Sequence, residues 1–278
     1  MSQYWLATFS EFIGTALLIL LGNGVCAAVS YKRMGANQAG KFVCIILGWG
    51  LAVFLAALVS SSMGGVGHLN PAVTIMDAIS VAGKSDLSGT VYGHAMSEMN
   101  LAKEAAIAIT FVLFTVFQFV GAMFGQVVSN FINFKFITDK ENDLLTIRGC
   151  HATAPAYENK KDKATIFNFA YEFIGTLVLV GLIVAFGAGS NKIQGENGAL
   201  GTIPVAFLIM SIGLSLGSAT GYAINPVRDF GPRMVFVLFA KIFRKDEFNK
   251  GMINWEYAWV PVVAPMLAGA IVGLITLI

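Results

Sequence analysis

Two asparagine-proline pairs are the residues of this sequence best suited to hold a small polar molecule. "HLNPAVT" contains Asn70 and Pro71, and "YAINPVRD" contains Asn225 and Pro226. Asparagine is a favoured N-cap and proline a favoured first helical residue, so each pair predicts a helix start. The carboxamide oxygen can cap backbone N–H groups while the NH2 group faces a lumen as a donor. This pattern indicates hydrogen bonding to a single-file molecule that carries hydroxyl or water oxygens.

The stretch after each pair is too short to cross a membrane alone. The run PAVTIMDAIS after Asn70 corresponds to roughly 15 Å of helix, half the hydrocarbon thickness of about 30 Å. After Asn225, the residues Asp229, Pro232 and Arg233 argue against an independent lipid-facing span. We therefore expect two half-helices that enter from opposite sides and meet near the midplane. Their N-terminal dipoles, each about half a positive charge, would repel cations there.

The segments that lead into the two pairs are "SSSMGGVGHL" and "SATGYAI", which are rich in small residues. Non-helical backbone at membrane depth is tolerated where protein or water satisfies it. Carbonyl groups would thus line the lumen opposite apolar walls, which predicts an amphipathic pore. We expect this backbone lining at Val66, Gly67, His68, Gly221 and Ala223. The His68 side chain is expected to pack with a hydrogen bond, in preference to acting as a gate or proton site.

Two glutamates recur inside the motif "EFIGT", at Glu11 and Glu172, each within an apolar run. A carboxylate at membrane depth is costly unless it is partnered. We expect each glutamate to accept hydrogen bonds from backbone N–H groups of the irregular loop in its half, as a buried structural support. A proton relay is the less favoured interpretation. Gln118, inside the third apolar run, is expected to support a loop in the same way.

These positions recur because the chain is a duplication. The offset between the EFIGT motifs is 172 − 11 = 161 residues, and that between the asparagines is 225 − 70 = 155. Each half holds three apolar runs, and because three is odd the second half enters the membrane from the opposite side. Such an inverted repeat places a site at the midplane between the halves. We expect one channel domain over 1–278, with a first repeat at 1–132, a connecting loop at 133–165 and a second repeat at 166–278.

The composition is that of a membrane protein, with 56% hydrophobic and 12% charged residues and a mean hydropathy of +0.72. Runs long enough to span a bilayer lie at about 5–30, 42–61, 105–132, 166–187, 203–219 and 258–278. The predicted fold class is an all-α membrane protein of six transmembrane helices and two re-entrant half-helices. A net charge of +2 without a basic and aromatic cluster argues against nucleic-acid binding. Neither metal-ligand spacing nor a cofactor motif is present, so we expect no metal and no cofactor.

With these motifs the chain resembles the major intrinsic protein family, the aquaporins, and within it the aquaglyceroporin or glycerol facilitator branch. The family's paired triplets correspond to Asn70, Pro71 and Ala72, and to Asn225, Pro226 and Val227. Val227 replaces the usual alanine and adds bulk where the half-helices abut. The resemblance implies one pore per protomer, a homotetramer, and a multi-pass location in the cell membrane. The stretch 82–104 is longer than the family's usual connector.

The resemblance also implies a four-position selectivity filter, formed here by Trp49, Gly213, Tyr222 and Arg228. Trp49 and Tyr222 would form an aromatic corner for a carbon backbone, while Arg228 donates to hydroxyl groups. Water-selective members typically carry histidine at the position of Gly213. Asp229, directly after Arg228, is a marker of the glycerol branch. The implied function is passive diffusion of glycerol and similar small neutral solutes, with some water, while ions and protons are excluded.

Three other classes of protein fit the sequence less well. A water-selective channel is disfavoured by Gly213 and Asp229. A coupled secondary transporter has similar inverted repeats. It would more often need ionisable coupling residues at the midplane, however, and the sequence offers only the paired glutamates and Arg228 for that role. An enzyme is least favoured, because no nucleophile with its base appears. The lysine and arginine counts in the loops favour a membrane orientation opposite to that of the family. Passive conduction does not depend on this orientation.

Overall fold

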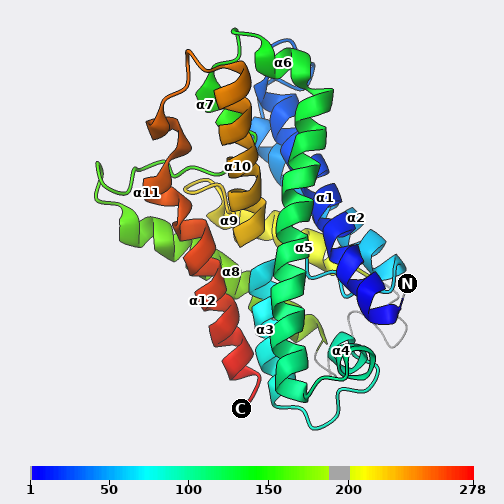
Figure 1. The fold of residues 1–278 in the computed structure, drawn as a ribbon. Helices are drawn as coiled ribbons and strands as arrows, with labels where there is room; N and C mark the ends of the chain where they lie inside the picture. The colour runs from blue at the N-terminus through cyan, green and yellow to red at the C-terminus, as the bar shows by residue number, and fades with distance from the viewer. Residues whose placement is uncertain (1, 188–200) are drawn as a thin grey trace.

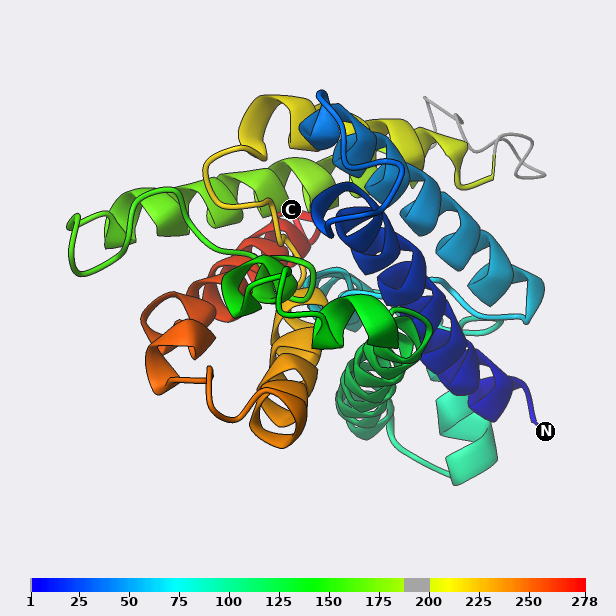
Figure 2. The ribbon, with the colours of Figure 1, turned by 90° about the horizontal axis from the view of Figure 1, so that it is seen from above.

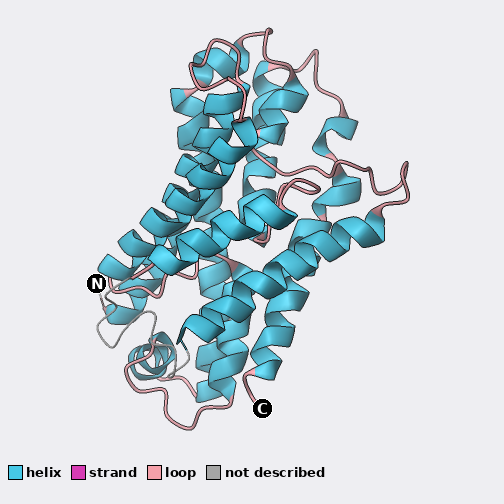
Figure 3. Ribbon diagram, turned by 180° about the vertical axis from the view of Figure 1, so that it is seen from behind, coloured by secondary structure: helices cyan, strands magenta, loops and turns pink. Residues whose placement is uncertain are grey.

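The protein is a bundle of helices in this computed structural model, which describes residues 2–187 and 201–278. Helices form all the regular secondary structure of these residues, and the described chain holds no strand (Figure 3). The long helices are α1 (Gln3–Ser30), α2 (Lys41–Ser62), α5 (Lys103–Ile132), α8 (Thr165–Gly187), α9 (Ile203–Leu216) and α12 (Val260–Ile275). The two helices that follow the asparagine-proline pairs are α3 (Pro71–Ala82) and α10 (Pro226–Phe243). The predicted all-α membrane fold is confirmed.

Short helices fill the connections between these long ones. The stretch 82–104 contains α4 (Val91–Met99), which begins at the side-chain cap of Thr90 on Gly93. The predicted connecting loop at 133–165 is partly helical, with α6 (Phe134–Thr138) and α7 (Leu144–Gly149). The 3-10 helix η1 (Lys250–Ile253) and α11 (Trp255–Ala258) precede α12.

Five of the six predicted spans are long and apolar enough to cross a membrane, among the residues that the structure describes. They are Gln3–Ser30, Lys41–Ser62, Lys103–Ile132, Thr165–Gly187 and Lys250–Ile275. The predicted span at 203–219 is shorter, because α9 has 14 residues and ends at Leu216, which corresponds to about 21 Å of helix. The chain leaves the helix at Gly217 and turns into the loop that precedes Asn225.

The second half-helix is longer than the sequence indicated. α10 has 18 residues, about 27 Å of helix, and it runs through Asp229, Pro232 and Arg233. As these residues led us to expect, α10 is not one of the candidate membrane spans found among the described residues. The charges of Asp229 and Arg233 are tolerated in the interior because they neutralise each other. Arg233 Nη2 lies 2.7 Å from Asp229 Oδ1, one turn earlier, and both side chains are fully buried.

Close packing of the long helices builds a frame around the two half-helices. α1 packs against α2 and α5, α2 against α9, and α8 against α9 and α12, which the view from above displays (Figure 2). Two glycines allow close approach: a Cβ on Gly125 of α5 would lie 2.2 Å from the Ala16 carbonyl oxygen of α1, and one on Gly269 of α12 would lie 2.2 Å from that of Ala72. α3 and α10 both lie between α5 and α12 (Figure 1). The frame thus holds the two half-helices on one line.

Candidate functional site

Each half-helix is capped by its own asparagine. Asn70 Oδ1 accepts a hydrogen bond from the Ala72 N–H at 2.9 Å. Asn225 Oδ1 accepts from the N–H groups of Val227 and Arg228 at 3.2 and 3.3 Å. Both asparagines have extended backbones, as an N-cap residue requires. The two helix starts therefore lie where the sequence placed them.

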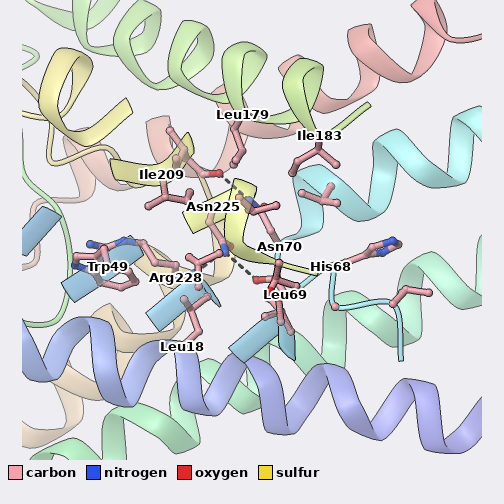
Figure 4. Close-up of a pocket in the computed structure, with 18 of the residues that line it drawn as sticks. Leu18, Trp49, His68, Leu69, Asn70, Leu179, Ile183, Ile209, Asn225 and Arg228 are labelled. Atoms are coloured by element: carbon pink, nitrogen blue, oxygen red, sulfur yellow. Dashed lines mark hydrogen bonds between the residues drawn. The ribbon is translucent and has the colours of Figure 1, made fainter. Parts of the chain in front are cut away.

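The same two asparagines join the halves to each other. Asn70 Nδ2 donates to the Ile224 carbonyl oxygen, and Asn225 Nδ2 donates to that of Leu69, both at 2.8 Å (Figure 4). Each NH2 group was expected to donate into the lumen, and the structure adds that each also donates to the opposite loop. An amide nitrogen carries two N–H groups, so one remains on each side chain for a solute.

The residue before each asparagine has a left-handed backbone. Leu69 has φ +53° and Ile224 has φ +42°, and Tyr222 nearby has φ +36°. Such values are unfavourable for non-glycine residues, above all for a β-branched one, and persist where the surroundings hold them. They turn the carbonyl groups of Leu69 and Ile224 toward the asparagine of the opposite half. The junction therefore depends on whatever holds these two loops.

Glu11 holds the first loop. Its carboxylate accepts hydrogen bonds from the N–H groups of His68 and Leu69 at 2.9 and 2.7 Å. Gln118 Nε2 donates to the same carboxylate at 2.7 Å and to Thr74 Oγ1 at 3.0 Å. Glu11 and Gln118 are fully buried. A buried carboxylate with three donors is satisfied, so the geometry is that of a structural support.

Glu172 holds the second loop in the corresponding way. It accepts from the N–H groups of Ala223 and Ile224 at 3.1 and 2.7 Å, and from the Tyr257 hydroxyl at 3.2 Å. Tyr257 thus takes the place that Gln118 has in the first half. Sequence reasoning missed Tyr257, which lies 85 residues from its partner and in no recognisable motif.

A cavity of about 310 Å³ runs past the junction of the half-helices. Its apolar lining residues include Leu18, Val53, Val73, Leu179, Ile183, Val205 and Ile209. The predicted site residues that line it are Trp49, Val66, Gly67, His68, Asn70, Tyr222, Ala223, Asn225 and Arg228. The cavity therefore combines an apolar wall with a limited set of polar groups.

Arg228 and Trp49 lie together at one end of this cavity, and His68 lies at the other (Figure 4). The Arg228 guanidinium carbon is 4.1 Å from the centroid of the Trp49 ring, a cation–π contact. Both side chains are buried, so Arg228 does not extend to the membrane surface. Within the described chain, Trp49 Nε1 and the Tyr222 hydroxyl have no hydrogen-bond partner. Buried polar groups are normally paired, so a solute can serve as their partner.

Neither Gly213, expected in the selectivity filter, nor Gly221, expected in the pore-lining backbone, is among the residues that line the cavity. A Cβ on Gly213 would lie 3.1 Å from the ring of Tyr222 and 3.0 Å from Ile46, so Gly213 lies behind the Tyr222 ring. Gly221 has φ +82°, and a Cβ there would lie 3.0 Å from Thr153. A side chain at this position would therefore meet the connecting loop. Pro71, Ala72, Pro226 and Val227 are buried in the packing around the junction and do not line the cavity either.

Asp229 ties the connecting loop to α10. Its Oδ2 accepts from the N–H and the hydroxyl of Thr153, both at 2.7 Å, and its Oδ1 accepts from Arg233. Arg233 also donates to the carbonyl oxygens of Thr153 and Ile253. This network fixes the helix turn that carries Arg228. The spacing of four residues between Asp229 and Arg233 was the available signal for the pair.

At the other end, His68 lies close to a carboxylate that the sequence did not single out. His68 Nε2 is 3.5 Å from Asp77 Oδ2, and its ring meets the Phe114 ring edge-on at a centroid distance of 5.8 Å. Asp77 also lines the cavity. Among the described residues, no group of three or more His, Cys, Asp or Glu side chains could hold a metal ion. The arrangement can bind and orient a neutral polar molecule.

The chain is similar to known proteins along nearly its whole length. The sequence profile of the family described as Major intrinsic protein matches residues 1–276. A "Probable glycerol uptake facilitator protein" of Mycoplasmoides gallisepticum is 37% identical over 95% of this chain and 93% of its own. A "Glycerol uptake facilitator protein" of Streptococcus pneumoniae is 38% identical over 96% of both chains. The X-ray structure of the aquaglyceroporin from Plasmodium falciparum has a TM-score of 0.71 and 27% identity, covering 98% of this chain and 94% of that one.

Proposed function

Because the chain belongs to the major intrinsic protein family, we propose that the cavity between its half-helices conducts glycerol across the membrane by passive diffusion. Its relatives include proteins named glycerol uptake facilitators, and one solved structure similar to it is that of an aquaglyceroporin. The chain is therefore an integral membrane channel and not an enzyme. Similar small neutral solutes and some water share the path, while ions and protons are excluded.

The observation that carries this proposal is the mixed lining of the cavity, which is apolar in part and hydrogen-bonding in part. The side chains of Leu179, Ile183 and Ile209 present an apolar wall. The amide groups of Asn70 and Asn225, at the start of the two half-helices, are the hydrogen-bonding part of the lining. Glycerol has the same division, with a carbon backbone on one side and three hydroxyl groups on the other. A cation at this point would face two helix N-termini, each with about half a positive charge.

We place the selectivity filter at the Arg228 end, with Trp49, Tyr222, Gly213 and Arg228 as its members. Trp49 and Tyr222 offer aromatic faces to the carbon backbone, and Arg228 donates to hydroxyl groups. Gly213 acts indirectly, because the absence of a side chain leaves the space that the Tyr222 ring occupies. The support for this filter is the position of three of its members on the cavity wall and of the fourth directly behind Tyr222.

We propose a homotetramer, as the family resemblance implies. Many large apolar side chains of the long helices are exposed in the single chain, including Leu182 of α8 and Phe207 of α9. Between α8 and α9 lies an apolar groove that contains Ser211 and Ser215. Lipid or a neighbouring protomer would cover these surfaces. Each protomer keeps its own pore, because the cavity is enclosed by helices of one chain.

The direct test is stopped-flow light scattering on proteoliposomes. We expect reswelling in a glycerol gradient to be much faster than in empty liposomes, with faster shrinkage in sucrose as well. Fast shrinkage without glycerol reswelling would instead identify a water-selective channel. Glycerol flux that required a proton or sodium gradient would identify a coupled transporter. Flux that follows the glycerol gradient alone satisfies the proposal.

A histidine at position 213 is expected to suppress glycerol flux more than water flux. A Cβ there already lies within 3.1 Å of Tyr222 and 3.0 Å of Ile46, so the imidazole of Gly213→His must displace the Tyr222 ring into the filter. The measurement is the ratio of glycerol to water permeability in proteoliposomes, with Gly213→Ala as the smaller matched change. Equal loss of both permeabilities in Gly213→His would show that the filter lies elsewhere.

A further inference from the structure

Asp77 places a carboxylate on the channel wall at the end away from Arg228. It lies seven residues after Asn70 on α3, which is close to two helical turns and about 10 Å along the axis. Asn70, Val73 and Asp77 accordingly share one face of α3, and all three line the cavity. The Asp77 side chain is 32% exposed, so solvent or solute reaches it.

The carboxylate is held by residues from two other segments. The Tyr92 hydroxyl of α4 donates to Asp77 Oδ2 at 2.9 Å, and His68 Nε2 lies 3.5 Å from the same oxygen. Burial and the neighbouring carboxylate raise the pKa of Tyr92, so its hydroxyl stays protonated and donates. An ionised carboxylate offers about four lone-pair sites. These two contacts use one oxygen, so acceptor capacity remains for a molecule in the cavity.

The segment that supplies Tyr92 is the stretch 82–104, to which the sequence assigned no role. Tyr92 is almost fully buried. Lys103 Nζ donates to the carbonyl oxygens of Ala82 and Lys84, at 2.7 and 2.6 Å, and so closes the base of this segment. The long connector is therefore an ordered element that presents a hydroxyl group to the channel wall.

The duplication does not explain this carboxylate. The residue seven positions after Asn225 in the second half is Pro232, which is buried inside α10. Asp77 thus has no counterpart in the other repeat. A carboxylate in a membrane-embedded cavity is costly and functional by default. Neither the junction nor the filter uses it.

We propose that Asp77 is a specificity-determining residue that forms a hydroxyl-binding subsite for neutral polyols at the α4 end of the channel. This proposal rests on the proposed glycerol channel and adds a subsite to it. A polyol that enters here must lose part of its hydration shell, and the carboxylate accepts hydrogen bonds from its hydroxyl groups in place of water. Charge-assisted bonds of this kind are the stronger ones. Water keeps more of its hydrogen bonds on entry and depends less on this acceptor.

The test compares Asp77→Asn with the wild-type protein in proteoliposomes. The amide keeps the shape but replaces one acceptor oxygen by a donor. We expect glycerol permeability to fall about five-fold, as the loss of one charge-assisted hydrogen bond in a transport step would cause, with water permeability changed less than two-fold. The matched control is Asp86→Asn, an exposed acid of the same connector that bonds the Ser88 N–H. Its glycerol-to-water ratio should equal that of the wild type.

A second variant guards against simple misfolding. Tyr92→Phe keeps the aromatic ring and leaves the Asp77 charge in place, but it removes the hydrogen bond that orients Asp77. We therefore expect glycerol permeability to fall about two-fold, in the same direction as in Asp77→Asn. An unchanged glycerol-to-water ratio in Asp77→Asn, or equal loss of both permeabilities, would overturn the subsite. Absence of glycerol flux in the wild-type protein would overturn the proposed function itself. The two failures are therefore distinguishable.

Discussion

Replacement of Glu172 by leucine is expected to abolish conduction and to destabilise the folded protein. The substitution leaves the buried N–H groups of Ala223 and Ile224 without their acceptor. Each unpaired buried N–H costs about 1–3 kcal/mol, so the total is about 2–6 kcal/mol. The left-handed conformation of Ile224 at φ +42° also loses its support. Its carbonyl group would then no longer meet Asn70, and the junction of the half-helices would open.

Thermal unfolding in detergent and glycerol flux in proteoliposomes together measure this effect. Glu11→Leu should behave like Glu172→Leu, because Glu11 bonds the N–H groups of His68 and Leu69 in the same way. Glu104→Leu is the matched control, since Glu104 is exposed in the first turn of α5. A Glu172→Leu variant with wild-type unfolding temperature and flux would refute the structural role of this carboxylate.

The glutamine variant separates the two interpretations of the glutamates. Glu172→Gln keeps one carbonyl oxygen as an acceptor, so we expect reduced stability and partial glycerol flux. A proton relay would give the opposite pattern, with full stability but a loss of any proton-dependent transport. Glycerol flux measured with and without a pH gradient distinguishes these cases.

Replacement of Arg228 by alanine is expected to make the channel leak protons and small cations. Arg228 is buried over Trp49 and places a full positive charge on the cavity wall. Electrostatic barriers of this kind, together with helix N-termini, exclude protons and cations from pores. Removal of the guanidinium also widens the filter. We expect proton permeability to rise at least about ten-fold, which corresponds to about 1.4 kcal/mol of barrier.

A pH-sensitive dye enclosed in proteoliposomes measures the proton leak, and planar-bilayer recordings measure the cation current. Arg33→Ala is the control, because the Arg33 side chain is exposed and pairs with Glu141 at the protein surface. Glycerol permeability of Arg228→Ala should remain high, since the apolar wall and both asparagines are untouched. Unchanged proton and cation exclusion would mean that the helix dipoles at the junction supply the barrier without Arg228.

Features that repeat within the chain could be predicted well. The asparagine caps, the two half-helices and the glutamates beneath the loops follow from short motifs that occur twice at nearly one offset. Capping is a local effect between residues two or three apart. The membrane class and the helical fold follow from composition and apolar run length in the same way. The comparisons with the major intrinsic protein family agree with that fold and function.

The lengths of some helices and the contacts made by individual residues were predicted less well. With 18 residues α10 is longer than the half-helix that was expected, and Asp229 and Arg233 neutralise each other in its interior. A Cβ on Gly221 would meet Thr153, because the connecting loop folds back onto α10. Val227, which adds bulk where the half-helices abut, is buried and is not among the residues that line the cavity.

By itself the sequence determined the duplication, the membrane class, the two helix starts and the residue types at the junction. These depend on local capping and on the apolar character of long runs, and both can be recognised from residues that are close together in the sequence. Only the tertiary structure decided which donors complete each carboxylate, such as Tyr257 on Glu172 and Tyr92 on Asp77. It also decided that Arg228 lies over Trp49. The physical reason is that a buried polar group takes its partner from whatever segment packing brings within about 3 Å, and sequence distance carries no information about that.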